Sequence, residues 1–248
     1  MQMTKLKCTV AYDGSHFFGY QVQPGRRTVQ REIESALERI HHGEKVRITA
    51  SGRTDSGVHA YGQVFHFESP LAIPEKNWPK ALNSILPDDI YIRDAEIVPA
   101  HFHARYDVKR KEYHYRLLTR SEPDLFRRLY TLHVTVPLDL QKMNEAAARI
   151  TGTHDFSCFC AANTEVKSKI RTVYQLDVVP RPADETLIRI SGSGFLYQMV
   201  RIITGTLLDV GTGKLQPDDV SKIIAGKDRQ AASKTVSPCG LTLWKVSY

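Results

Sequence analysis

Near the start of the chain, the spacing of hydrophobic residues changes from every second position to helical spacing. In residues 5–12 apolar side chains occupy every second position, which is the pattern of a half-buried strand. In residues 28–40 they recur at helical spacing behind Thr28, a good N-cap residue, and Gly43 ends the pattern. We therefore expect a strand followed by a helix.

The same alternation continues through the first hundred residues. Strand patterns cover residues 45–50, 63–68 and 89–98, and a helical pattern covers residues 76–86. The resulting order, β-α-β-β-α-β, is that of a ferredoxin-like unit.

The second half repeats this order with larger insertions. Strands are predicted over residues 110–118, 171–179, 186–191 and 241–248, and helices over residues 139–150, 195–210 and from Pro217 onward. No linker rich in Pro, Gly or Ser separates the halves, so we expect residues 1–104 and 105–248 to be fused. The predicted class is α+β: two ferredoxin-like halves in a mostly antiparallel mixed sheet with helices on one side.

Composition and charge narrow the function only slightly. Of the 248 residues 42% are hydrophobic and 25% are charged, which is typical of a globular protein. The net charge of +7 favours a polyanionic partner such as nucleic acid. The four cysteines lack the density of a disulfide scaffold, and we find neither a signal peptide nor a membrane-spanning run. We expect a cytoplasmic protein.

The segment Ser51–Ala60, SGRTDSGVHA, carries the first candidate chemistry. Arg53 and Asp55 lie two residues apart on a Gly- and Ser-rich loop between two predicted strands. One interpretation is an Asx turn, with Asp55 binding nearby backbone N–H groups and Arg53 solvated. The other is a reactive carboxylate on a rigid loop.

Arg201 lies in a helical pattern that is apolar almost all round, and such a helix is mostly buried. A buried guanidinium needs a partner, because an unpaired buried charge costs several kcal/mol. Arg201 either forms a structural ion pair, extends to the edge, or pairs with Asp55 across the two halves. The last arrangement would keep the carboxylate ionised, as a nucleophile or base requires.

Three further patterns have competing interpretations. Tyr113 and Tyr115 share one strand face after the basic run 109–111, which indicates either packing or a stacking platform beside phosphate-binding groups. Phe65 and Phe67 alternate like the base-stacking aromatics of an RNA-recognition motif, or face the core. A metal site is not predicted, because His154, Cys158 and Cys160 lack a second cysteine pair.

Beyond these patterns, the chain resembles the tRNA pseudouridine synthase A family nearly end to end. The similar stretches are collinear: AYDGSHFFGYQVQ, TVQREIESAL, SGRTDSGVHA, ALNSILPDDIYI, FHARYDVKRKEYHYRL, GFLYQMVRIITGTLLDVG and GLTLWKVSY. The chain departs from the family pattern at Tyr20, Ser56 and Ala232, where Trp, Ala and Gly are common. None of these departures removes a charged side chain.

The resemblance implies a pseudouridine synthase fold and a role for each matched residue. Asp55 matches the catalytic aspartate, and Arg53 the arginine that helps displace the target base. Tyr113 matches the tyrosine that stacks on uracil, and Arg201 the arginine that pairs with the aspartate. The family acts as a homodimer on tRNA and uses neither a cofactor nor a metal.

The function implied is isomerisation of uridine to pseudouridine at positions 38, 39 and 40 of the tRNA anticodon stem-loop. Two other functions remain open from the residues. One is a non-catalytic RNA-binding protein of tandem ferredoxin-like units, and the other is an enzyme acting on small phosphorylated metabolites.

Overall fold

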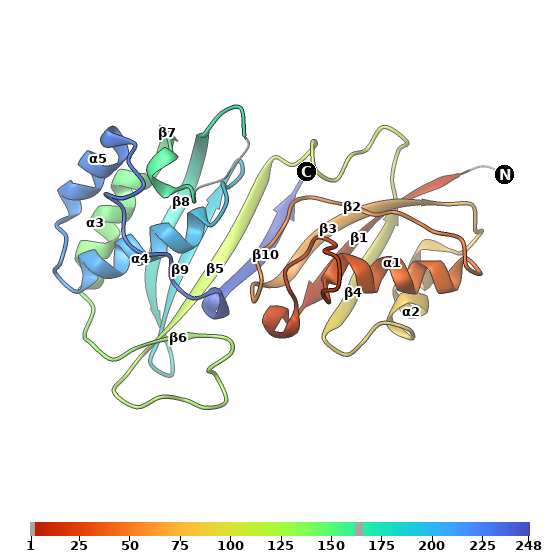
Figure 1. The fold of residues 1–248 in the computed structure, drawn as a ribbon, viewed down its shortest axis with the longest axis horizontal. Helices are drawn as coiled ribbons and strands as arrows, with labels where there is room; N and C mark the ends of the chain where they lie inside the picture. The colour runs from red at the N-terminus through yellow and green to blue at the C-terminus, as the bar shows by residue number, and fades with distance from the viewer. Residues whose placement is uncertain (1–2, 162–165) are drawn as a thin grey trace. The chain divides into compact units, whose positions relative to one another are not determined.

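The computed structural model describes residues 3–161 and 166–248, and the chain forms two compact units (Figure 1). The first unit contains Met1–Lys109 together with Thr242–Tyr248, and the second contains Arg110–Leu241. This division is one of compactness, and the domain boundary expected between residues 104 and 105 stays a prediction. In the described ranges no helix is both long and apolar enough to span a membrane.

The first unit has the predicted element order β-α-β-β-α-β, followed by a strand from the distant end of the sequence. Its elements are β1 (Thr4–Tyr12), α1 (Val29–Ile40), β2 (Thr49–Ala50), β3 (His59–Ser69), α2 (Trp78–Asn83), β4 (Ile90–Ile97) and β10 (Leu241–Ser247). Single 3-10 turns, Gly14–His16 and Glu75–Asn77, follow β1 and precede α2.

Strand β1 lies at the centre of the first unit's sheet. It pairs antiparallel with β3 on one side and with β4 on the other. The other edge of β3 is shared by β2, antiparallel, and β10, parallel. Every second residue of β1 is buried, as the period-two pattern predicts, and the buried residues join the apolar face of α1 in one core.

Strand β2 is shorter than predicted, because a helix side chain takes the hydrogen bonds of the residues before it. The backbone N–H of Ile48 donates to Glu34 Oε1 at 3.2 Å, and Arg47 Nη1 donates to Glu34 Oε2 at 2.9 Å. Glu34 belongs to α1, so residues 47–48 are bound to the helix and pairing with β3 begins only at Thr49.

In its described residues, the second unit combines five paired strands with three helices. Its elements are β5 (Arg110–Thr119), β6 (Leu132–Val134), α3 (Leu140–Ile150), β7 (Gly152–Asp155), β8 (Ile170–Arg181), β9 (Glu185–Gly192), α4 (Met199–Gly211) and α5 (Pro217–Gly226). The strand order is β5-β9-β8-β7, all antiparallel, and β6 runs parallel to the end of β5. Single 3-10 turns occur at Ser157–Phe159 and Pro238–Gly240.

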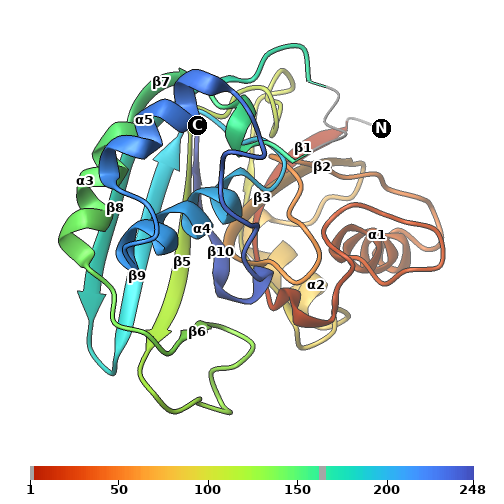
Figure 2. The same ribbon diagram turned by 60° about the vertical axis from the view of Figure 1, so that its left-hand side comes forward.

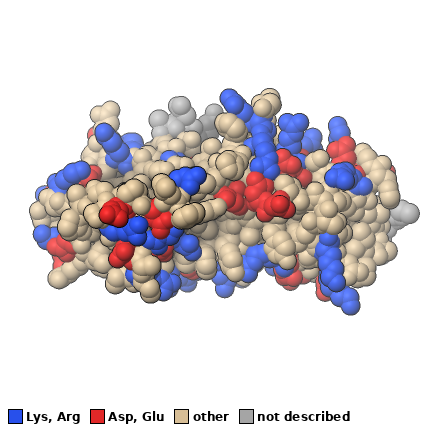
Figure 3. Space-filling view, turned by 90° about the horizontal axis from the view of Figure 1, so that it is seen from below, with Lys and Arg blue, Asp and Glu red and all other residues tan. Residues whose placement is uncertain are grey.

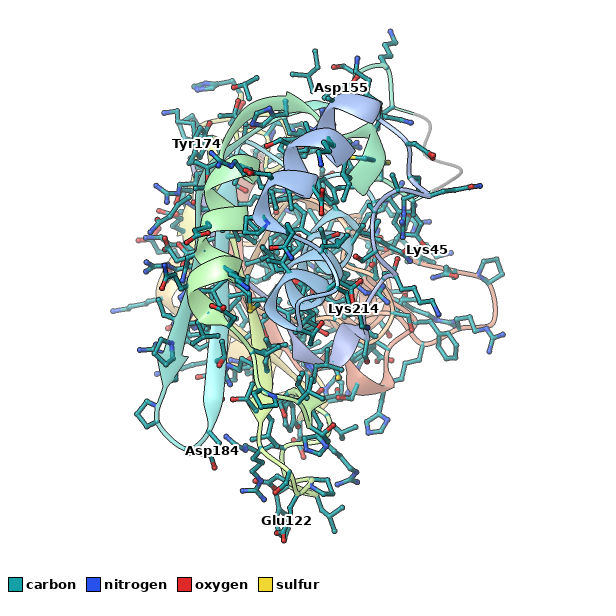
Figure 4. All side chains as sticks on the ribbon, turned by 90° about the vertical axis from the view of Figure 1, so that its left-hand side faces the viewer. Lys45, Glu122, Asp155, Tyr174, Asp184 and Lys214 are labelled. Carbon is teal, nitrogen blue, oxygen red and sulfur yellow. The ribbon has the colours of Figure 1, made fainter. Side chains whose placement is uncertain are left out.

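The helices of the second unit cover one face of its strands. Figures 1 and 2 both show α3, α4 and α5 on the same side of β8 and β9, and α3 packs directly against β8, α4 and α5. Figure 4 shows Asp184 at the turn between β8 and β9, and Glu122 on the loop after β5. The carbonyl of Asp184 accepts the N–H of Thr119 at 2.7 Å, which ties that turn to the end of β5. The α+β class and the mostly antiparallel mixed pairing are confirmed.

Helix α4 begins at Met199, four residues later than the hydrophobic pattern predicts. Gln198, which precedes it, has φ of 57°, a left-handed conformation that a right-handed helix cannot include. Ten of the thirteen residues of α4 are buried, as expected for a helix that is apolar almost all round.

An extended segment, residues 233–237, is bound along α4. The N–H of Ser233 donates to Thr206 Oγ1 at 3.3 Å, and the Tyr115 hydroxyl on β5 donates to the carbonyl of Ser237 at 2.6 Å. The contact is close enough to require glycine: a Cβ on Gly205 would lie 2.2 Å from the carbonyl oxygen of Lys234. The segment can therefore lie this close to α4 only because Gly205 has no side chain.

We predict that Gly205→Ala lowers the free energy of unfolding by about 1–3 kcal/mol, because the added methyl displaces backbone that has no room to move. Gly226→Ala, at the exposed end of α5, is the matched control, since nothing lies within 4 Å of its Cβ position. The control should be neutral or stabilise by about 0.4–1 kcal/mol. Urea unfolding of the two variants makes the comparison, and equal midpoints would contradict the packing argument.

Candidate active site

The Arg-Thr-Asp loop, defined here as residues 51–58, connects β2 to β3 in the first unit. Three consecutive side chains on it differ sharply in exposure: Arg53 is exposed, Thr54 is buried and Asp55 is half-buried. Thr54 therefore anchors the loop in the protein, while Arg53 and Asp55 on either side of it reach the surface.

Thr54 is the anchor of the loop. Its hydroxyl lies 2.8 Å from the Tyr12 hydroxyl at the end of β1, and its carbonyl accepts the N–H of Tyr20 at 3.1 Å. Burial raises the pKa of Tyr12, so its hydroxyl stays protonated. Gly19 completes the contact, because a Cβ there would lie 2.9 Å from the Thr54 carbonyl oxygen. Both backbone and side chain of Thr54 are therefore held.

The upstream end of the loop is fixed by the amide of Gln63 on β3. Gln63 is fully buried; its Oε1 accepts the Ser51 hydroxyl at 2.7 Å, and its Nε2 donates to the carbonyl of Gly52 at 2.9 Å. The N–H of Ser51 also donates to the carbonyl of Val64 at 2.7 Å. These bonds continue the sheet into the loop.

The downstream end is fixed against the turn that follows β1. The N–H of Val58 donates to the carbonyl of Asp55 at 3.2 Å, and the N–H of Gly57 donates to the carbonyl of Phe17 at 3.3 Å. A Cβ on Gly14 would lie 2.0 Å from the Val58 carbonyl oxygen, so this turn touches the loop backbone directly. The N–H of Gly14 donates to Nδ1 of buried His59 at 3.0 Å. Asp55 thus has little freedom to move with its loop.

Arg201 is half-buried on the first turn of α4, in the second unit. Its Nε donates to the carbonyl of Val236 at 2.9 Å, and the N–H of Val236 approaches the Arg201 carbonyl at 3.5 Å. The segment 233–237 therefore holds the guanidinium on a mostly buried helix. Its expected pairing with Asp55 stays a prediction.

The two tyrosines of β5 have different surroundings. Tyr115 is fully buried and its hydroxyl is bonded to Ser237. Tyr113 is 8% exposed, and its ring meets that of Phe195 edge to face, with centroids 5.2 Å apart. The structure assigns Tyr115 to the support of the segment 233–237 and leaves Tyr113 as the candidate for stacking.

The competing interpretations of the other motifs are resolved within the described residues. Phe65 and Phe67 are at most 1% exposed and belong to the core, so they do not form a base-stacking surface. Cys158 and Cys160 are both buried. Across residues 3–161 and 166–248, no three His, Cys, Asp or Glu side chains converge as a metal site would require.

Several residues that support the site were not found from the sequence. Tyr12 and Gln63 lie in strand patterns where they look like ordinary core positions, and Phe195 was expected inside a helix. Only a contact between distant segments distinguishes them, and periodicity carries no such signal.

Positive charge is not gathered in one continuous field on the face drawn in Figure 3. Lys and Arg side chains there lie among Asp and Glu side chains. On that face the cations are therefore distributed singly and in small groups.

Comparison with known proteins adds independent information. A family model described as tRNA pseudouridine synthase matches residues 9–107 and 146–248. Arg53, Asp55 and Arg201 lie within these segments, and Tyr113 lies between them. A solved structure of a Cbf5-Nop10-Gar1 complex is only weakly similar, with a TM-score of 0.35 and 14% identity over 82% of this chain and 54% of that chain.

Similar curated proteins cover almost the whole chain. "tRNA pseudouridine synthase A" of Bacillus licheniformis is 55% identical over 245 residues, and the protein of that name from Bacillus subtilis (strain 168) is 54% identical over 245 residues. Each alignment covers 98% of this chain and 99% of the relative. The chain therefore belongs to the tRNA pseudouridine synthase family.

Proposed function

We propose that the protein is a tRNA pseudouridine synthase that isomerises uridine at positions 38, 39 and 40 of the anticodon stem-loop. The observation that carries this is the half-buried carboxylate of Asp55 on a loop fixed at both ends, in a chain that belongs to this family. Family membership favours this function over non-catalytic RNA binding and over an enzyme for small phosphorylated metabolites.

The reaction requires a carboxylate and a pocket closed to water. The N1–C1′ bond of uridine breaks, the uracil turns, C5 joins C1′, and the proton lost from C5 is balanced by one gained at N1. Whether the carboxylate attacks C1′ or removes the 2′ proton, it must be ionised and correctly placed. Nothing is oxidised or hydrolysed, so the proposal includes neither a cofactor nor a metal.

Each remaining residue has one role in this proposal. Arg53, exposed beside Asp55, helps displace the target base from the helix stack, a step that costs a few kcal/mol. Tyr113 stacks on the uracil after detachment, with its ring oriented by Phe195. Arg201, oriented by Val236, pairs its guanidinium with the Asp55 carboxylate.

The oligomeric state, cellular compartment and RNA partner are proposed from the family resemblance. We propose a homodimer in the cytoplasm that binds tRNA without a metal ion. Size-exclusion chromatography with light scattering tests the dimer.

We predict that Asp55→Asn lowers the rate of pseudouridine formation by about three orders of magnitude or more, as expected when an essential catalytic side chain is lost. The fold should persist, because the carboxamide has nearly the same shape. Unmodified tRNA is incubated with the protein and its pseudouridines are mapped by chemical derivatisation. Asp88→Asn, at an exposed position of the same unit, is the matched control. Wild-type rates in Asp55→Asn would end the catalytic assignment.

We predict that Tyr113→Phe retains more activity than Tyr113→Leu, because the phenylalanine ring still stacks. Tyr115→Phe is the control: it removes the hydrogen bond to Ser237, so it should cost about 1 kcal/mol of stability with little change in rate. Single-turnover rates and thermal unfolding separate the two effects. Equal losses in Tyr113→Phe and Tyr113→Leu would show that the hydroxyl matters instead of the ring.

We predict that Arg201→Ala lowers both stability, by about 1–3 kcal/mol, and catalytic rate, because it removes a charged donor from a buried helix. Arg189→Ala breaks a partly exposed ion pair with Asp177 and should cost at most about 1 kcal/mol with no change in rate. Urea unfolding and single-turnover assays are run on both. An unchanged rate in Arg201→Ala would remove it from the site.

A further inference from the structure

Two adjacent Arg–Phe pairs occur in residues 17–27, beside the Arg-Thr-Asp loop. The Arg27 guanidinium lies 4.1 Å from the centroid of the Phe17 ring, and the Arg26 guanidinium lies 4.4 Å from that of Phe18. The residue types are identical in the two pairs, so their surroundings decide what each can do.

The Phe17–Arg27 pair is structural. Phe17 is 2% exposed, and Arg27 binds Asp89 through two hydrogen bonds of 2.7 and 2.9 Å. Arg27 Nε also donates to Glu32 at 3.2 Å. Its charge is therefore already satisfied within the first unit.

The Phe18–Arg26 pair is open to solvent. Phe18 is 45% exposed and Arg26 is exposed. Among the described residues Arg26 forms no ion pair with a carboxylate, in contrast to Arg27. An exposed aromatic ring with an uncompensated guanidinium over it presents the two groups that single-stranded nucleic acid binds: a stacking surface and a cation for phosphate.

The backbone that carries this open pair is fixed by hydrogen bonds. The N–H of Phe18 donates to the carbonyl of Arg27 at 2.9 Å, which closes the loop, and Gln23 Nε2 donates to the carbonyl of Phe18 at 2.6 Å. The N–H of Arg26 donates to the carbonyl of Gln23 at 3.2 Å. A preformed platform loses little conformational entropy when a base stacks on it.

The backbone on both sides of Phe18 also contacts the loop that carries the candidate catalytic residue. The carbonyl of Phe17 accepts the Ser56 hydroxyl at 3.1 Å, in addition to the N–H of Gly57. Gly19, on the other side of Phe18, touches the Thr54 carbonyl. The backbone of Phe18 is thus fixed against residues 54–57, the part of the loop that includes Asp55.

We propose that Phe18 and Arg26 form a binding platform for an unpaired nucleotide of the anticodon loop, which stacks its base on Phe18 and places a phosphate at Arg26. This inference rests on the proposed function, which makes the partner an RNA. The platform holds the strand beside the nucleotide that reacts at Asp55, so it contributes to affinity and positioning without touching the reacting atoms.

Binding to an anticodon stem-loop RNA tests the platform. The RNA carries 2-aminopurine at one unpaired loop position at a time, and stacking on Phe18 should quench its fluorescence at one position. Phe18→Ala should abolish that quench and weaken binding about tenfold, within the range known for loss of one stacked base. Phe18→Trp should restore both. Affinity within twofold of wild type in Phe18→Ala, or failure of Phe18→Trp to restore it, would overturn the proposal.

The salt dependence of binding tests the cation. Arg26→Gln should reduce the slope of log K against log salt concentration by about one, as expected for one lost phosphate contact. Arg39→Gln removes an equally exposed charge from the last turn of α1 and should leave the slope unchanged. Equal slopes for Arg26→Gln and wild type, or equal changes in the two variants, would also overturn the proposal.

Pseudouridine mapping with the wild-type protein separates this inference from the proposed function. If pseudouridine forms and Phe18→Ala binds normally, the platform is wrong and the enzyme assignment stands. If no pseudouridine forms but binding depends on Phe18 as described, the platform stands and the enzyme assignment fails.

Discussion

The position of Asp55 depends on the burial of one neighbour, Thr54. Its hydroxyl contacts Tyr12, its carbonyl binds Tyr20, and the bare backbone of Gly19 lets the two segments touch. A loop rich in Gly and Ser would otherwise sample many conformations, and a carboxylate on it would have to be repositioned at each turnover. Because Thr54 is anchored, the loss of conformational entropy occurs when the first unit folds and not at each turnover.

Equal residue types take different roles in this protein because their surroundings differ. Tyr113 and Tyr115 share a strand face, yet one meets an aromatic edge while the other supports a backbone segment through its hydroxyl. Arg26 and Arg27 are adjacent and both lie over phenylalanine rings, yet within the described part of the chain only Arg27 forms ion pairs with carboxylates. Fewer cations are therefore available to bind a polyanion than the composition implies, because those paired with carboxylates, such as Arg27, are already neutralised.

Much of the fold could be predicted from the sequence, because period-two and helical patterns report local structure directly. The element order of the first unit was predicted correctly, and so were β5, β8, β9 and the helices of the second. The short strands β6 and β7 were missed, and β10, expected to close the second half, belongs to the first unit. The errors occur where a distant group intervenes: Glu34 removes residues 47–48 from β2, and the left-handed Gln198 delays α4. For the site, residue types drew attention to Arg53, Asp55, Arg201 and the tyrosines of β5, and the family resemblance assigned the roles, which stay predictions. The hydrogen bonds that hold them required coordinates, since Gln63 and Tyr12 carry no local mark.

The strand β10 has a consequence for how the chain is made. It pairs with β3 in the first unit, although Arg110–Leu241, the whole of the second unit, separates it in sequence from Lys109. Such a distant pairing raises the contact order and slows folding. The entropic cost of closing a long loop arises before the strand forms any stabilising contact. During translation one edge of β3, at His59 and Ala60, must wait for its partner until the second unit has been synthesised. Until then the nascent chain exposes an unpaired strand edge, a feature that favours aggregation and binding by chaperones.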